Sequence, residues 1–106
     1  MMTIEPQFGI LTIEHPKDLE FELEKASIFD FDSNLILECT SWNIPDFEAH
    51  IELLNKINVY LLELNKSFVI VHPAEDGNQF EPLVVIPTLH EAKEFVIMDE
   101  LMRQIN

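Results

Sequence analysis

Histidines and the carboxylates near them are the side chains in this sequence that could bind a metal ion. The sequence has four histidines, at His15, His50, His72 and His90. None stands in a spacing, such as His-x-x-x-His, that brings two ligands together on one element. The best local cluster joins His72, Glu75 and Asp76, and His90 falls near it if this segment folds over the last helix. Zinc needs three or four converging donors, so a metal-dependent hydrolase is the weakest of three hypotheses, and we expect no metal or cofactor.

Other catalytic arrangements are also missing from the sequence. Close carboxylates occur at Glu20, Glu22 and Glu24 and at Asp99 and Glu100. They belong to regularly charged faces, whereas acid and base catalysis needs two carboxyls in different environments. The serines lack the Gly-x-Ser-x-Gly pattern of an activated nucleophile, and two glycines are too few for the usual phosphate-binding loops. The sequence therefore predicts a protein that is not an enzyme.

The chain is strongly acidic, with 20 Asp and Glu against 6 Lys and Arg and a formal net charge of −14 over 106 residues. This charge repels phosphate backbones and anionic membranes, so we expect neither as a partner. The single cysteine, Cys39, lies in an apolar run and is expected to be buried and inert. The first residues lack a basic segment and an apolar signal core, and no apolar run reaches the roughly 20 residues of a membrane span. We therefore expect a cytoplasmic protein.

Apolar runs of strand length alternate with helical patterns along the chain. Strands are predicted over residues 8–13, 34–40, 67–71 and 83–86. The nearly continuous hydrophobicity of 34–40 favours a central strand that is covered on both faces. Residues 17–32 fit both a half-buried strand and a helix. Parallel flanking strands favour the helix, which we prefer, whereas a hairpin would place its turn at residues 15–18.

Two later segments carry start signals for helices. Asn43 can cap the first helix, and Pro45 suits its first turn. This helix is predicted over residues 45–64, with an inward stripe of Phe47, Ile51, Leu54, Ile57 and Leu61. The second helix starts at the capping-box pattern of Thr88 and Glu91. Its inward stripe is predicted as Ala92, Phe95, Met98, Met102 and Ile105.

Val96 and Ile97 fall outside the predicted inward stripe of the last helix, and they are more apolar than a free surface needs. Either neighbouring segments cover them, or they form a contact with a partner or with a second copy in a homodimer. The order of strands and helices predicts one compact α/β domain.

Four segments of the sequence resemble the STAS domain of bacterial anti-sigma-factor antagonists: NLILECT, WNIPDFEAHIELLNKI, SFVIV and LVVIPTLHEAKEFVIMDELMRQI. The likeness covers roughly residues 34–105 and is most specific at Pro-Thr-Leu-x-Glu-Ala, residues 87–92. The resemblance implies a single domain over residues 1–106, with a mixed sheet of about four strands flanked by helices. It also implies a protein that docks against a partner through the loop and helix after the central strand.

Signalling members of this family carry Asp-Ser-Ser-Gly at that helix start, where a phosphorylated serine breaks the partner contact. The aligned residues here are Asp46, Phe47, Glu48 and Ala49, so the usual switch cannot operate. The resemblance implies a partner surface made of Asp46, Phe47, Glu48 and His50. Asp46 would set the loop, Phe47 would anchor in the core or in the partner, and Glu48 would meet a basic residue. The expected partner is an anti-sigma factor or another regulatory protein, in signalling or scaffolding.

Two alternatives accompany this leading hypothesis. Some STAS-like domains bind nucleotides or lipids, so small-ligand binding is the second hypothesis. Short proteins with this ending often carry the label ribonuclease Z, whose activity requires a histidine and aspartate metal cluster in a much larger hydrolase. That cluster is absent from this sequence, and we expect no such activity.

Overall fold

The computed structural model describes residues 1–73 and 80–105, and five strands in it form one mixed sheet with the order β1-β2-β3-β4-β5. The strands are β1 (Met2–Ile4), β2 (Phe8–Thr12), β3 (Asn34–Glu38), β4 (Phe68–Val71) and β5 (Val84–Ile86). β1 pairs antiparallel with β2, and the other neighbours pair parallel. The α/β class and the central place of β3 are confirmed. The sequence did not predict β1, because three residues are too few to show a period.

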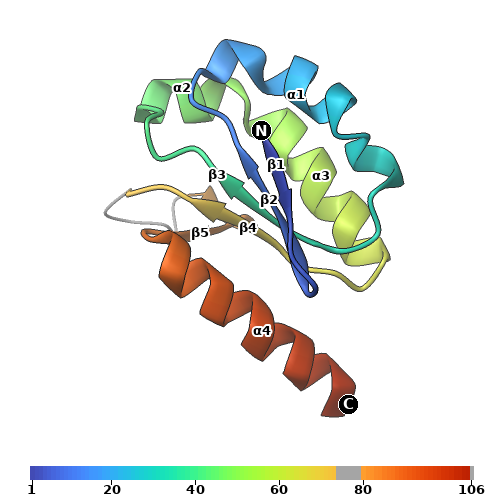
Figure 1. Cartoon of the computed structure of the whole chain (residues 1–106). Helices are drawn as coiled ribbons and strands as arrows, with labels where there is room; N and C mark the ends of the chain where they lie inside the picture. The colour runs from blue at the N-terminus through green and yellow to red at the C-terminus, as the bar shows by residue number, and fades with distance from the viewer. Residues whose placement is uncertain (74–79, 106) are drawn as a thin grey trace.

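Helices cover both faces of this sheet. α1 (Leu19–Lys25) lies between two short 3-10 turns, η1 (Pro16–Asp18) and η2 (Ile28–Asp30), and α2 (Ile44–Ala49) and α3 (Ile51–Glu63) follow β3. These three helices lie on one face, and α4 (Leu89–Ile105) lies on the other (Figure 1). The helix preferred for residues 17–32 is confirmed, because the parallel pair β2 and β3 needs a crossover. Over residues 1–73 and 80–105, no helix is both long and apolar enough to cross a bilayer.

The sheet buries both of its faces, as the continuous hydrophobicity of its central strand predicted. On β3, Leu35 and Leu37 point into the larger core, and Ile36 points into a smaller core under α4. All three side chains are fully buried. The helices contribute these fully or nearly fully buried residues to the larger core: Leu19, Leu23, Phe47, Leu54, Ile57 and Leu61. Ile51 is half-buried and packs against this core, so four of the five residues of the inward stripe predicted for residues 45–64 are fully buried and the fifth is partly covered.

The helix predicted as continuous over residues 45–64 is broken at His50, which separates α2 from α3. His50 has φ −112° and ψ 10°, and its backbone N–H bonds to the carbonyl of Phe47 at 3.1 Å. The ring Nδ1 of His50 lies 2.9 Å from the carbonyl oxygen of Asp46, which a continuous helix would pair with the His50 N–H. The imidazole thus takes the place of the backbone donor at the break.

The inward stripe predicted for the last helix is wrong except at Ala92. Phe95, Met98 and Met102 are exposed, and Ile105 is 78% exposed. The inward positions are instead Ala92 and Val96, which pack on Ile36 and Val69 of the sheet. Val96 is fully buried within its own chain, so the homodimer contact predicted through it is wrong. Ile97 is half-buried. The prediction failed because α4 has apolar residues on two opposite faces, and the sheet accepts the narrower one.

Candidate functional site

The start of α2 is fixed by a reciprocal cap. The backbone N–H of Asp46 donates to Oδ1 of Asn43 at 2.8 Å, and the backbone N–H of Asn43 donates to Oδ2 of Asp46 at 3.3 Å. Pro45 lies in the first turn, where its missing N–H costs no hydrogen bond. Asp46 is half-buried and occupied by this cap. Of the four residues predicted for the partner surface, Asp46 therefore shapes the loop, as expected.

Phe47 anchors α2 in the core and is fully buried. Its ring centroid lies 4.7 Å from that of Phe80, 5.1 Å from that of His72 and 6.1 Å from that of Trp42. Trp42 is itself tied to β2's end, since its Nε1 donates to the carbonyl of Ile13 at 2.9 Å. Phe47 was expected to anchor in the core or in a partner, and the structure places it in the core. It cannot touch a partner without unfolding α2.

Glu48 and His50 occupy the outer side of the same turn. Glu48 is exposed and lines a pocket of about 240 Å³ with Ile51, Phe80 and Glu81. His50 is half-buried, and its ring centroid lies 5.5 Å from that of Trp42. The carboxylate of Glu48 is therefore the predicted contact that faces solvent, and His50 supports the turn that holds it.

The histidines of the weakest hypothesis lie in different environments. His72 is buried at the end of β4, and its Nε2 lies 2.6 Å from the carbonyl oxygen of Trp42, so this nitrogen carries the proton. His90 is exposed on α4, where its Nε2 lies 2.5 Å from Oε1 of Glu94. Residues 74–79, with Glu75, Asp76 and most of the long polar loop, lie outside the described residues. In the described part of the chain, no three His, Cys, Asp or Glu side chains are grouped to hold a metal ion.

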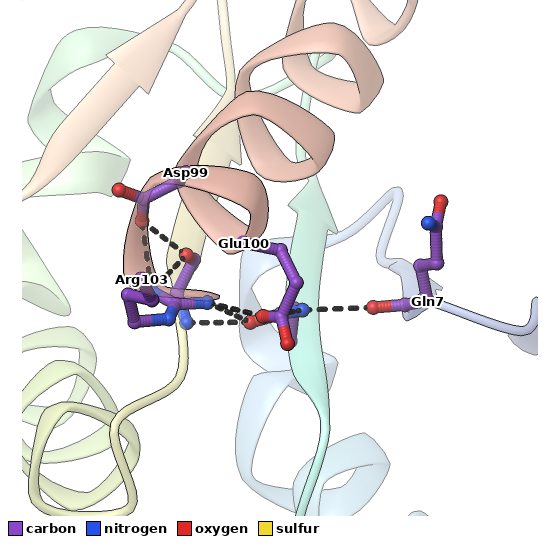
Figure 2. A network of polar contacts seen from close by, with 6 residues as sticks. Gln7, Asp99, Glu100 and Arg103 are labelled. Carbon is purple, nitrogen blue, oxygen red and sulfur yellow. Dashed lines mark hydrogen bonds and ion pairs between the residues drawn. The ribbon is translucent and has the colours of Figure 1, made fainter. Parts of the chain in front are cut away.

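A polar network joins α4 to the starts of β3 and β4 (Figure 2). Arg103 donates to Ser67 Oγ at 3.0 Å, Asp99 Oδ2 at 3.0 Å, Asn34 Oδ1 at 2.9 Å and Glu100 Oε2 at 2.6 Å. Asn34 Nδ2 donates to Glu100 at 3.1 Å, and the Ser67 N–H donates to Asn34 Oδ1 at 2.8 Å. Hydrogen bonds from Arg103 and Asn34 lower the pKa of Glu100 below its ordinary value of 4.5. This network was not predicted from the sequence, although the i,i+4 spacing of Asp99 and Arg103 was a visible signal.

Cys39 has the inert environment that the sequence predicted. It is 1% exposed, and its Sγ lies 3.7 Å from the carbonyl oxygen of Val71. Burial, with a smaller effect from the charge of Glu38, raises the pKa of the Cys39 thiol to about 12. The thiol is therefore protonated at neutral pH and does not act as a nucleophile.

A second pocket, of about 400 Å³, lies between α1, η2 and α3. Apolar side chains of Leu23, Ile28, Phe29 and Leu53 form part of its wall. Carboxylates of Glu20, Glu24 and Asp30 also line it. The pocket therefore combines an apolar surface with negative charge.

Comparisons with protein families, curated proteins and solved structures gave no match to this chain. The resemblance to STAS domains therefore stays a prediction from the sequence.

Proposed function

We propose that this protein is a non-enzymatic, STAS-like interaction module that binds a regulatory protein through the start of α2. The observation that carries the proposal is the exposed carboxylate of Glu48 on a helix start that is fixed by a cap and by a buried ring. The cap between Asn43 and Asp46 fixes the loop, and the buried ring of Phe47 fixes the first turn. Such a turn presents its outer side chains with little loss of conformational entropy on binding.

The partner that this surface fits carries basic residues. Glu48 and Glu81 are both exposed and line the same pocket, so two carboxylates lie beside the start of α2. The net charge of −14 adds a long-range attraction for a basic protein, and this attraction weakens as salt rises. Phe47 and Glu48 stand where signalling members of the family carry serines, and neither has a hydroxyl. Since Phe47 is also buried, the proposed contact is not switched by phosphorylation at this turn.

Affinity capture from a native lysate tests this proposal, with anti-sigma factors as the first candidates to identify. Glu48→Lys should abolish capture of a specific partner, because it places a like charge against the basic surface. Glu63→Lys, at the far end of α3 and also exposed, makes the same change in charge and should leave capture intact. No specific partner with the native protein, or equal capture by the two variants, would refute the proposal.

Small-ligand binding is the second proposal, and the pocket between α1 and α3 is the observation that favours it. Its carboxylates repel the phosphates of nucleotides and of anionic lipids, so the pocket fits an apolar or cationic small molecule better. A thermal-shift screen tests this, because a ligand at one hundred times its dissociation constant adds about 2.7 kcal/mol of stability. Phe29→Ala removes an apolar side chain from the wall of the pocket. A ligand that raises the melting temperature of this variant as much as that of the native protein binds elsewhere.

A further inference from the structure

The outer face of α4 is an apolar surface that no described part of the chain covers. The outer stripe consists of Phe95, Met98, Leu101, Met102 and Ile105. Their exposed fractions are 37%, 59%, 49%, 54% and 78% in that order. The stripe lies across the sheet from α2, so it is independent of the surface proposed above (Figure 1). Clustered exposure of this kind marks an interaction site more often than isolated apolar residues do.

The charged residues of the same segment form hydrogen bonds on the sheet side of the helix. Between positions 95 and 105 the charged residues are Asp99, Glu100 and Arg103. All three are half-buried. Arg103 bonds to both carboxylates, and each of the three residues bonds to Asn34 or Ser67 on the sheet side. A helix on a free surface has the opposite arrangement, with charges outward and apolar residues inward. This inversion is the arrangement expected of a helix whose outer face is buried in a contact.

The spacing of the outer stripe is symmetric. Phe95, Met98, Met102 and Ile105 are separated by three, four and three residues, so position 100 is their midpoint. In an antiparallel pair of identical helices centred there, Phe95 faces Ile105 of the partner and Met98 faces Met102, while Leu101 flanks the contact on one side. We propose that α4 packs against α4 of a second copy of this chain in such a two-fold, antiparallel contact.

The absence of charged side chains within the outer stripe favours an apolar partner surface, such as the same stripe of a second copy, over a basic one. No charged side chain lies within the outer stripe, so two copies bring only apolar side chains together at its centre. The exposed carboxylates of Glu91 and Glu94 precede the stripe. In the antiparallel pair they lie at one end of the contact in one copy and at the opposite end in the other, so the two acidic pairs stay far apart. A basic helix lying along the stripe would meet carboxylates at one end only.

The available area suits a dimer of moderate strength. At roughly 200 Å² for a large side chain, the exposed fractions amount to roughly 550 Å² per chain. A symmetric pair then buries about 1,100 Å², near the lower bound for a specific interface. We therefore expect association in the micromolar range rather than a permanent dimer.

Sedimentation equilibrium of the purified chain, at about 10 to 500 μM, tests the contact. Met98→Glu should raise the dissociation constant at least about tenfold, because each copy would bury an unpaired carboxylate. Leu62→Glu is the matched control, since Leu62 on α3 is exposed by the same 59% but lies on the other face of the sheet. Circular dichroism of both variants checks that they fold. A monomer throughout this range, or a dimer that Met98→Glu leaves intact, overturns the proposal.

Salt and cross-linking add two signatures of this particular pairing. Added salt should strengthen the dimer, because it screens the repulsion between two chains of net charge −14, whereas it would weaken a complex with a basic partner.

Under oxidation, a mixture of Met98→Cys and Met102→Cys chains should cross-link faster than either variant alone. The native Cys39 is buried and does not compete. Faster cross-linking within one variant would indicate parallel helices and refute the antiparallel register.

Discussion

Replacement of Arg103 by Met should detach the C-terminal half of α4 from the sheet. Arg103 bonds to Asp99, Glu100, Asn34 and Ser67, and its side chain is only 19% exposed. Methionine keeps most of the aliphatic length but provides no donor. The variant therefore leaves the carboxylates of Asp99 and Glu100 without their shared cation. It also removes the donor that binds the side-chain oxygens of Asn34 and Ser67.

The magnitude follows from how far the network is buried. An exposed ion pair contributes about 0.2–1 kcal/mol, whereas removal of one partner from a buried pair costs about 3–5 kcal/mol. Glu100 is 24% exposed and Asp99 is 40% exposed, so this network lies between the two cases. We expect Arg103→Met to lower the free energy of unfolding by about 2 kcal/mol, a value typical of lost hydrogen bonds to a charged group.

Urea unfolding followed by circular dichroism measures this change, because α4 is the longest helix in the described part of the chain. With a slope of about 2 kcal/mol per molar urea, the midpoint should fall by about 1 M. Lys56→Met on α3 is the control, because it removes the same charge at an exposed position and should change stability by less than about 0.5 kcal/mol. If both variants lost equally little, the network would contribute nothing to the attachment of α4.

The pH dependence of the same variant gives a second check. The pKa of Glu100 is lowered in the folded state, mainly by the hydrogen bond from Arg103. A lowered carboxyl pKa adds stability above the ordinary value of 4.5, and this stability is lost as pH falls below 4.5 through the folded value. The stability difference between native protein and Arg103→Met should therefore shrink as pH falls from 7 to below 4.5. A difference that stays constant over this range would contradict the assigned cause.

Three further predictions concern α2 and its surroundings. Phe47→Ala should cost about 3–5 kcal/mol in urea unfolding, because it empties a fully buried site between three aromatic rings; a loss below about 1 kcal/mol would mean that the site is not packed as described. Asn43→Ala should cost about 1 kcal/mol by removing the cap, and Asn43→Ser should recover most of it, as thermal unfolding can show. Cys39 should not react with a thiol reagent at pH 8 until urea unfolds the chain, since its pKa is about 12; fast reaction in the native protein would contradict this.

Local signals in the sequence were sufficient for the start of α2. Asn43, Pro45 and the apolar spacing after them act over one or two turns, and the structure has the cap and the buried stripe that they predicted. The break at His50 was not predicted, because it depends on a ring that bonds to a carbonyl four residues back and contacts Trp42 at a tilted angle. The parallel pairing of β2 and β3, a long-range property, was needed to decide residues 17–32 in favour of the helix.

The orientation of α4 could not be predicted from its own sequence. Its apolar residues form two faces, and the larger face matched the expected stripe, so periodicity favoured the wrong one. The sheet decides, because Asn34 and Ser67 at the strand starts offer polar partners to Asp99, Glu100 and Arg103. Arg103 and Asn34 are 69 positions apart in the chain, and no local pattern connects them.

Among the described residues, α4 alone shields the second side of the sheet, and this has a consequence for how the protein fails. Beneath it lie Ile10, Ile36, Val69 and Val71, a patch of β-branched side chains. Only Ala92 and Val96 of α4 are fully buried against this patch. The polar network near Arg103 is therefore the second set of contacts that attaches the helix to the sheet. Release of α4, by acid or by loss of Arg103, would expose this apolar patch, which is prone to aggregation, while the other side of the sheet stays folded. Turbidity should therefore rise in the Arg103→Met protein at urea concentrations below those that unfold the core around Trp42.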